Sequence, residues 1–124
     1  MATILVVEDE ATVLVLAESY LQEQGHKTLS ASTAQEALAL IEGDEPIDLL
    51  FTDLGLKDDL AAGIAIAKRA VERRPSLNVL YTTGQMVTDG MRAMFVQGSA
   101  MLEKPYTVDQ LSTTLVARFS ITPG

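Results

Sequence analysis

The sequence predicts an α/β fold, a doubly wound, five-stranded parallel sheet with helices on both faces. Short apolar runs recur along the chain, and segments of helical length separate them. Such uninterrupted apolar runs are typical of strands that are buried on both sides in a parallel sheet. Strand and helix alternate five times, which implies right-handed crossovers and therefore helices on both faces of the sheet.

Glycine, proline and hydroxyl residues mark the ends of the first three strand–helix pairs. Gly25 and Gly43 are helix stops, and Pro75 ends the third helix. Ser32 or Thr33 can cap the second helix. The expected elements are a strand at 3–7, a helix at 11–24, a strand at 26–31, a helix from the cap through residue 41, a strand at 47–52, and a helix from 63 or 64 to about 74.

The last two pairs complete the predicted sheet. A strand at 78–82 leads to a helix at about 88–97, which Gly98 ends, and a strand at 100–103 leads to a helix at 108–119. We expect one domain over residues 1–121, with residues 122–124 as a C-terminal tail. A chain of 124 residues, 48% of them hydrophobic, is long enough to bury a core of its own.

Composition excludes several classes of function. The formal net charge of −8 argues against direct binding to nucleic acid, because phosphate backbones repel such a surface. The absence of cysteine excludes disulfides, thiolate metal sites and a cysteine nucleophile. The N-terminal apolar run does not resemble a signal peptide, and no apolar stretch approaches the roughly 18 residues of a membrane span. We therefore expect a cytoplasmic protein that does not contact the membrane.

Acidic residues directly follow two of the predicted strands. Glu8 and Asp9 come after the first strand, and Asp53 comes after the third. Because the carboxyl ends of parallel strands meet at one edge of the sheet, we expect these carboxylates to lie close together. Two like charges 4 Å apart repel by about 4 kcal/mol at an effective dielectric constant near 20, so such a group requires a cation or raised pKa values. Carboxylate oxygens without histidine or cysteine favour Mg²⁺ or Mn²⁺.

A hydroxyl and an ammonium follow the fourth and fifth strands. Thr83 precedes Gly84, which allows a tight turn that points the hydroxyl over the sheet edge. Lys104 precedes Pro105, and its ammonium can reach a carboxylate or a phosphoryl group across that edge. The sequence therefore predicts a site for a divalent cation and an oxyanion together.

In order and spacing, these segments resemble the receiver domain of two-component response regulators, over essentially the whole chain. The matching segments are Leu5–Glu10, Asp48–Leu54, Tyr81–Gly84 and Leu102–Tyr106. The resemblance implies a flavodoxin-like (βα)5 fold. It is compatible with a free-standing receiver and with a receiver from a hybrid histidine kinase or a larger regulator.

The resemblance also implies residue roles. Asp53 would accept a phosphoryl group from a phosphohistidine on a sensor histidine kinase or a histidine phosphotransfer protein. Mg²⁺ would be held by Glu8, Asp9, Asp53 and the backbone carbonyl of Gly55, and Thr83 and Lys104 would bind the phosphoryl oxygens. The domain would then be a self-resetting switch, not a turnover enzyme. It would signal to an unknown downstream protein and could pair as a homodimer through its fourth helix, fifth strand and fifth helix.

The chain departs from the family pattern in two places. Lys57 stands where most receivers have a proline, in a loop that is longer than usual and that carries Asp58 and Asp59. Met101 stands where the family often has an aromatic residue that moves with the hydroxyl residue. Four of the five methionines fall between residues 86 and 101. They either fill the core or form a face that repacks on phosphorylation and binds the next protein.

Three alternatives remain. An aspartate-nucleophile phosphatase requires a second Asp two residues after the nucleophile, where this chain has Gly55. A nucleotide- or flavin-binding module requires a glycine-rich loop after the first strand, where this chain has the acidic segment 8–10. A receiver-like module that binds partners without being phosphorylated is the third alternative, and the altered loop is the reason to keep it.

The helix at 11–24 carries a possible docking surface. Its predicted buried stripe is Val13, Leu16, Ala17, Tyr20 and Leu21. Leu14 falls at the edge of this stripe and Val15 on the opposite face. Both lie near Asp9, where they either dock the helical domain of a kinase or are scattered surface hydrophobes.

Overall fold

The structure is a computed structural model that describes residues 1–57 and 59–124. Its strands are β1 (Thr3–Val7), β2 (Lys27–Ala31), β3 (Leu49–Asp53), β4 (Asn78–Thr83) and β5 (Ala100–Glu103). All of them pair in parallel in one sheet, in the order β2-β1-β3-β4-β5. The chain leaves β1 for the edge strand β2 and then returns to β3 on the other side. The carboxyl ends of β1 and β3 therefore flank the point where the winding direction reverses.

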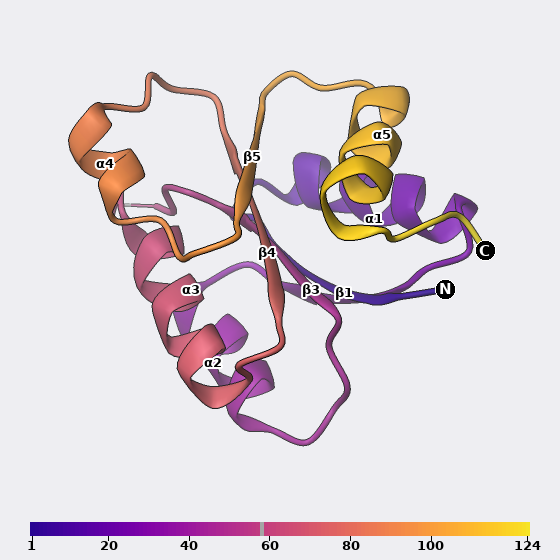
Figure 1. The fold of residues 1–124 in the computed structure, drawn as a ribbon, viewed down its shortest axis with the longest axis horizontal. Coiled ribbons are helices and arrows are strands. Elements are labelled where there is room, and N and C mark those ends of the chain that lie inside the picture. The colour runs from indigo at the N-terminus through magenta and orange to yellow at the C-terminus, as the bar shows by residue number, and fades with distance from the viewer. Residues whose placement is uncertain (58) are drawn as a thin grey trace.

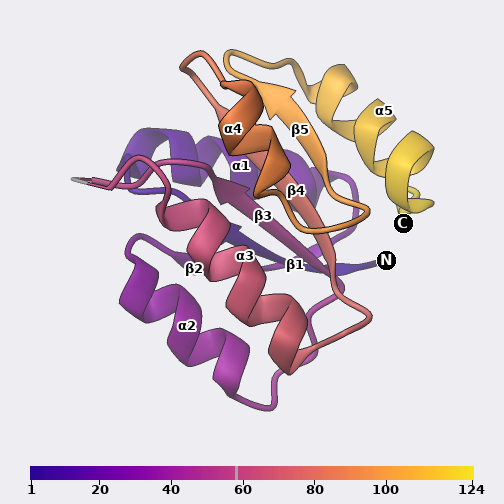
Figure 2. The ribbon, with the colours of Figure 1, turned by 60° about the vertical axis from the view of Figure 1, so that its left-hand side comes forward.

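Five helices cover the two faces of the sheet. They are α1 (Ala11–Glu23), α2 (Ala34–Glu42), α3 (Ala62–Arg73), α4 (Asp89–Ala93) and α5 (Val108–Phe119). Helices α1 and α5 lie on one face, and α2, α3 and α4 lie on the other (Figures 1 and 2). The predicted fold class is confirmed. Within the described residues, no helix combines the length and apolar character needed to cross a membrane.

Successive residues of the central strands point into two separate cores. Ile4 and Val6 of β1 belong to the core under α1 and α5, while Leu5 and Val7 belong to the core under α2 and α3. All five residues of β3 are buried. Burial on both faces explains why these strands are uninterrupted apolar runs in the sequence.

Most element boundaries match the sequence-based prediction within two residues, but the fourth helix does not. We predicted a helix at 88–97, and α4 covers only Asp89–Ala93. Its start is as expected, because the Thr88 hydroxyl accepts a hydrogen bond from the backbone of Met91. It ends early, at Ala93, because the next two amides, of Met94 and Phe95, bond to carbonyls three residues back. The Val96 amide then donates to the hydroxyl of Tyr81, 3.2 Å away.

The prediction for the buried stripe of α1 was wrong at one position. Ala17 and Leu21 are buried, but Leu16 is 47% exposed. Leu16 instead lines an open, mainly apolar cleft of about 390 Å³ between α1 and the segment that follows β5, together with Val13 and Tyr20. The helical periodicity identified the correct side of α1, but it could not show that the neighbouring segment leaves this cleft uncovered.

Candidate functional site

The three acidic residues at the carboxyl ends of β1 and β3 meet at one edge of the sheet. Val7 is paired with Thr52 in the ladder, so the next residues, Glu8 and Asp53, leave neighbouring strands side by side. Glu8, Asp9 and Asp53 each offer a carboxylate oxygen, and these oxygens lie within 4.8 Å of one another. We call this group the acidic edge. The structure thus brings together the carboxylates that the sequence places at strand ends.

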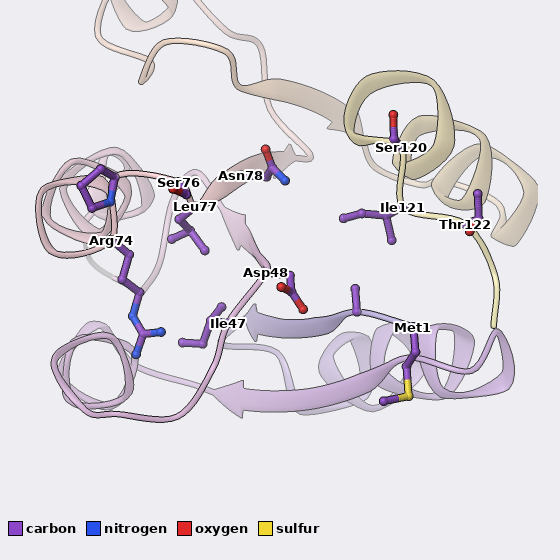
Figure 3. Close-up of a pocket in the computed structure, with 12 residues that line it drawn as sticks. Met1, Ile47, Asp48, Arg74, Ser76, Leu77, Asn78, Ser120, Ile121 and Thr122 are labelled. Carbon is purple, nitrogen blue, oxygen red and sulfur yellow. The ribbon is translucent and has the colours of Figure 1, made fainter.

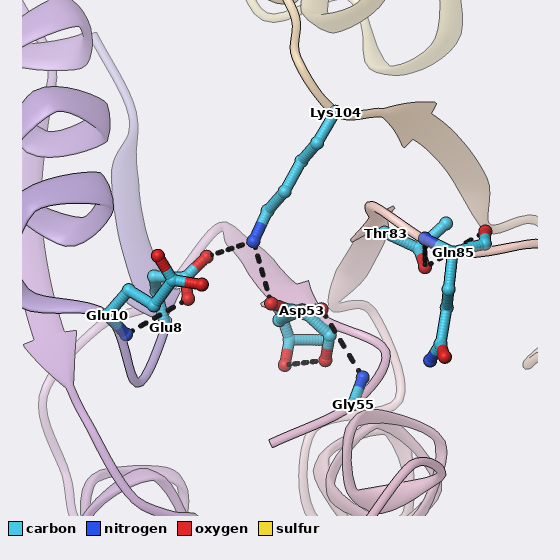
Figure 4. A network of polar contacts seen from close by, with 8 residues as sticks. Glu8, Glu10, Asp53, Gly55, Thr83, Gln85 and Lys104 are labelled. Atoms are coloured by element: carbon cyan, nitrogen blue, oxygen red, sulfur yellow. Dashed lines mark hydrogen bonds and ion pairs between the residues drawn. The ribbon is translucent and has the colours of Figure 1, made fainter. Parts of the chain in front are cut away.

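Lys104 bridges two of these carboxylates (Figure 4). Its Nζ donates to Asp53 Oδ2 at 2.8 Å and also to Glu8 Oε1. Its backbone amide donates to the carbonyl of Thr83 at 2.8 Å, which fixes the segment after β5 beside the end of β4. The peptide bond between Lys104 and Pro105 is cis.

Burial and charge act against each other at this edge. Burial raises the pKa of Glu8, and its hydrogen bonds with Lys104 and the Glu10 amide only partly oppose that rise. Burial lowers the pKa of Lys104, but its hydrogen bonds with Asp53 and Glu8 outweigh burial, so its pKa is raised overall. One ammonium faces three carboxylates, which leaves an excess of negative charge. Such a set of hard oxygen donors fits a small divalent cation.

Thr83 lies on the same edge, but its hydroxyl is turned toward its own loop. The hydroxyl accepts a hydrogen bond from the Gln85 amide at 3.1 Å and makes a weaker one, 3.4 Å long, to the Gln85 carbonyl. The hydroxyl therefore holds the turn after β4. Thr83 also lines the cavity above Asp53.

The loop after β3 contributes backbone to the site. The amide of Gly55 donates to Asp53 Oδ1 at 3.3 Å, so the two oxygens of Asp53 have different partners. Asp59 pairs with Leu56 through two backbone hydrogen bonds, each 2.9 Å long. Asp58, which we expected to add charge here, lies outside the described residues.

Sequence reasoning missed the role of Gly63. A Cβ on this glycine would lie 2.0 Å from the carbonyl oxygen of Asp53, so α3 begins against the backbone of the central carboxylate. The Gly63 amide donates to the Leu54 carbonyl at 2.8 Å. The only sequence signal is a glycine near the predicted helix start, and many glycines with no such contact share it.

The acidic edge opens into a cavity of about 320 Å³, lined by Asp9, Asp53, Gly55, Thr83 and Lys104, among others. A larger cavity, of about 590 Å³, lies at the opposite edge of the sheet (Figure 3). Its carboxylate, Asp48, already accepts a hydrogen bond from the Thr3 amide at 2.7 Å. We therefore place the chemistry in the smaller cavity, where carboxylates, a hydroxyl and an ammonium converge.

Comparison with known proteins agrees with this geometry. The family model of the response regulator receiver domain matches residues 4–116. The chain belongs to this receiver family. Receiver domains are signalling domains of two-component systems, and the resemblance seen in the sequence is thereby confirmed.

Relatives of this receiver domain include regulators and single receiver structures. The response regulator SaeR of Staphylococcus epidermidis is 23% identical over 124 residues, 97% of this chain and 52% of SaeR. The chain thus spans about half the length of that relative. A crystal structure of a response regulator receiver protein from Sinorhizobium medicae is 31% identical, with a TM-score of 0.82, and the match covers 94% of this chain and 96% of that one.

A third relative is the response regulator TrrA of Thermotoga maritima, solved in complex with Mg(2+)-BeF. It is 22% identical to this receiver, with a TM-score of 0.76, and the match covers 93% of this chain and 96% of that one. At this level of identity, the likeness shows a shared fold.

Proposed function

We propose that Asp53 is the phosphoacceptor of this receiver. In this proposal it takes a phosphoryl group from a phosphohistidine on a sensor histidine kinase or a histidine phosphotransfer protein. The observation that carries the proposal is the convergence on Asp53 of two further carboxylates and the Lys104 ammonium, at the mouth of a cavity. Asp53 is 9% exposed and lines this cavity, so part of its carboxylate is accessible to an incoming group.

The transfer needs positioning and neutralisation of charge more than covalent assistance. A carboxylate oxygen of Asp53 attacks the phosphorus, and the P–N bond to the imidazole breaks. The electron pair stays on the ring nitrogen, which is then protonated. Lys104 already lies at Asp53 and would bind a phosphoryl oxygen, and Thr83 would donate to another after turning away from Gln85.

The donor set at the acidic edge also supports a cation site. Glu8, Asp9, Asp53 and the Gly55 carbonyl would hold Mg²⁺, which supplies positive charge for the phosphoryl oxygens when bound. The carboxylate oxygens of this edge are close enough to share one ion. TrrA, the relative solved with Mg(2+)-BeF, supports this assignment by analogy of fold. Water would later hydrolyse the acyl phosphate, so that the domain resets and serves as a switch.

Intact mass after incubation with Mg²⁺ and acetyl phosphate tests the proposal. We expect one added, base-labile phosphoryl group on the wild type and none on Asp53→Asn. Asp44→Asn is the matched control, because Asp44 is fully exposed and remote from the acidic edge. Asp9→Asn should be phosphorylated only at much higher Mg²⁺. A wild-type chain that neither binds Mg²⁺ nor gains mass would instead support the module that binds partners without phosphorylation.

We further propose that the cleft beside α1 docks the kinase or phosphotransfer partner. Leu16 and Val15 are 47% and 60% exposed, and the cleft continues to Lys104, which reaches the phosphoacceptor. Leu14 packs partly against the core, which makes it a smaller part of the contact than we expected.

The docking proposal predicts a separation of two rates. Leu16→Ser should slow transfer from a phosphorylated histidine phosphotransfer domain by tenfold or more and leave phosphorylation by acetyl phosphate unchanged. Val116→Ser, at an exposed apolar residue of α5, is the control. Equal transfer rates in both variants would contradict the proposal.

Pairing through α4, β5 and α5 stays a prediction that sedimentation of the phosphorylated protein can check.

A further inference from the structure

A tyrosine hydroxyl, away from the acidic edge, reaches the segment that follows α4. Tyr81 lies in β4, two residues before Thr83, and is completely buried. Its ring packs against Phe95 with the centroids 4.4 Å apart. Its hydroxyl accepts a hydrogen bond from the Val96 amide, three residues after the end of α4. The phosphoryl-transfer chemistry proposed above uses none of these contacts.

The α4 segment, which we define as residues 88–98, has few other polar attachments to the sheet. None of the residues of α4 itself is buried. Among the described residues, the hydrogen bonds of this segment close within the segment or onto the adjacent Ser99, apart from the one to Tyr81. The remaining attachment is apolar packing by partly buried residues such as Met91 and Phe95. A segment held in this way can shift at modest cost once its one bond to a strand is broken.

Tyr81 of β4 supplies the aromatic ring next to the α4 segment. The residue paired with it in β5 has no ring. Tyr81 is paired in register with Met101, and both contribute to the same core. Side chains two residues apart on a strand share a face, so Tyr81 and Thr83 lie in one row under the edge of α4. The flexible Met101 beside this row can adapt if the ring moves.

We propose that the Tyr81–Val96 hydrogen bond is a latch that holds α4 in its unphosphorylated position, and that phosphorylation at the acidic edge weakens it. The second half rests on the proposed function. The latch would control the surface formed by the exposed Met86 and Met94, which flank α4. A change in the side chain of Thr83 would be transmitted to Tyr81, because the two side chains lie on the same face of β4. Burial raises the pKa of Tyr81, so its hydroxyl stays neutral at physiological pH.

Amide hydrogen exchange on the unphosphorylated protein tests the latch itself. Tyr81→Phe keeps the ring on Phe95 and removes only the acceptor. We expect exchange at Val96 and over residues 88–98 to speed up roughly tenfold, with the central strands unchanged. Tyr20→Phe, at a partly buried residue of α1 on the opposite face of the sheet from α4, is the control and should leave the α4 segment as in wild type. An exchange rate at Val96 in Tyr81→Phe that is within twofold of the wild-type rate would overturn the proposal.

Addition of Mg²⁺ and beryllofluoride, a mimic of the phosphoryl group, tests the coupling. We expect faster exchange over residues 88–98 in wild type and no further increase in Tyr81→Phe. If intact mass shows that acetyl phosphate phosphorylates Asp53, but exchange at Val96 in the wild type does not respond to beryllofluoride, the proposed coupling is wrong. If Asp53 gains none, the proposed function fails, and the unphosphorylated comparison still decides whether the latch exists.

Discussion

Gly63 sets the distance between helix α3 and the carboxylate of the acidic edge. The would-be Cβ of Gly63 falls 2.9 Å from the Cα of Leu54 as well as against the Asp53 carbonyl. Both are backbone atoms of the strand end that carries Asp53, the proposed phosphoacceptor. Backbone atoms cannot move away from a new Cβ as the end of a flexible side chain can. Any side chain at residue 63 must therefore displace either the helix or the strand.

Gly63→Ala should therefore destabilise the fold by roughly 1–3 kcal/mol, because it overpacks a backbone contact. Urea unfolding gives this free energy. Gly90→Ala is the matched control, since its Cβ would meet nothing nearer than the Thr88 hydroxyl oxygen at 3.8 Å. A Gly63→Ala protein as stable as Gly90→Ala would show that α3 can retreat from β3 at little cost.

At the scale of elements, α5 begins with a reciprocal cap. The Thr107 hydroxyl accepts from the Gln110 amide at 3.0 Å, and the Gln110 side chain accepts from the Thr107 amide at 2.8 Å. Two backbone donors that a helix start leaves unpaired are thereby satisfied. The cap follows Lys104 and Tyr106 closely, so it also fixes where the segment after β5 enters the helix.

Thr107→Ala should cost about 1 kcal/mol of stability, because it removes the acceptor for the Gln110 amide. Thr107→Ser keeps a hydroxyl there and should stay close to wild type. Thermal unfolding of the three proteins measures the difference. Equal losses in Ala and Ser would point to the threonine methyl group, not the cap, as the source of stability.

The same scale shows where sequence-based prediction works and where it stops. Strand ends, and with them Glu8, Asp9, Asp53 and Lys104, follow from uninterrupted apolar runs, because parallel strands finish at one edge. Just past the early end of α4, the Val96 amide donates to the Tyr81 hydroxyl, a contact between residues 15 apart in sequence. No local pattern encodes it. The exposure of Leu16 depends in the same way on a neighbouring segment.

The hydrogen bonds of the site could not be predicted from the sequence either. The order of residues predicts that Thr83 and Lys104 reach the acidic edge, and it cannot set side-chain rotamers. Lys104 already bonds to two carboxylates, whereas the Thr83 hydroxyl is held by the backbone of Gln85. Only the packed fold determines whether each of these side chains points into the site or bonds to its own loop.

At the scale of the whole molecule, both ends of the chain are attached to the turn between α1 and β2. The Ala2 amide donates to His26 Nδ1 at 3.1 Å, and the Gly124 amide donates to the Gln24 carbonyl at 2.7 Å. His26 is 4% exposed. Burial, together with the positive N-terminal amino group, lowers the pKa of His26. The fold therefore holds this histidine neutral, because protonated Nδ1 could not accept the Ala2 hydrogen bond.

The lowered pKa of His26 predicts that stability falls with acidity. Below the ordinary histidine pKa of about 6.5, the unfolded chain takes up a proton that the folded chain resists. This contribution to the free energy of unfolding is thus fully present above that pH, and it is lost as the pH falls toward the pKa of the folded state. His26→Asn retains an acceptor without the titration. We expect the stability advantage of wild type over His26→Asn to shrink between pH 7.5 and 5.5 in urea unfolding, and a constant difference would contradict this.

The meeting of the two ends has a consequence for how the chain can be rearranged. A Cβ on Gly124 would lie 3.6 Å from the Cβ of Met1, and the two ends lie near each other in Figure 1. A short glycine linker could therefore join them, and the chain could be reopened at an exposed loop as a circular permutant. Because the ends lie beyond the amino ends of the strands, tags or fused domains at either terminus would leave the cavity at the acidic edge uncovered.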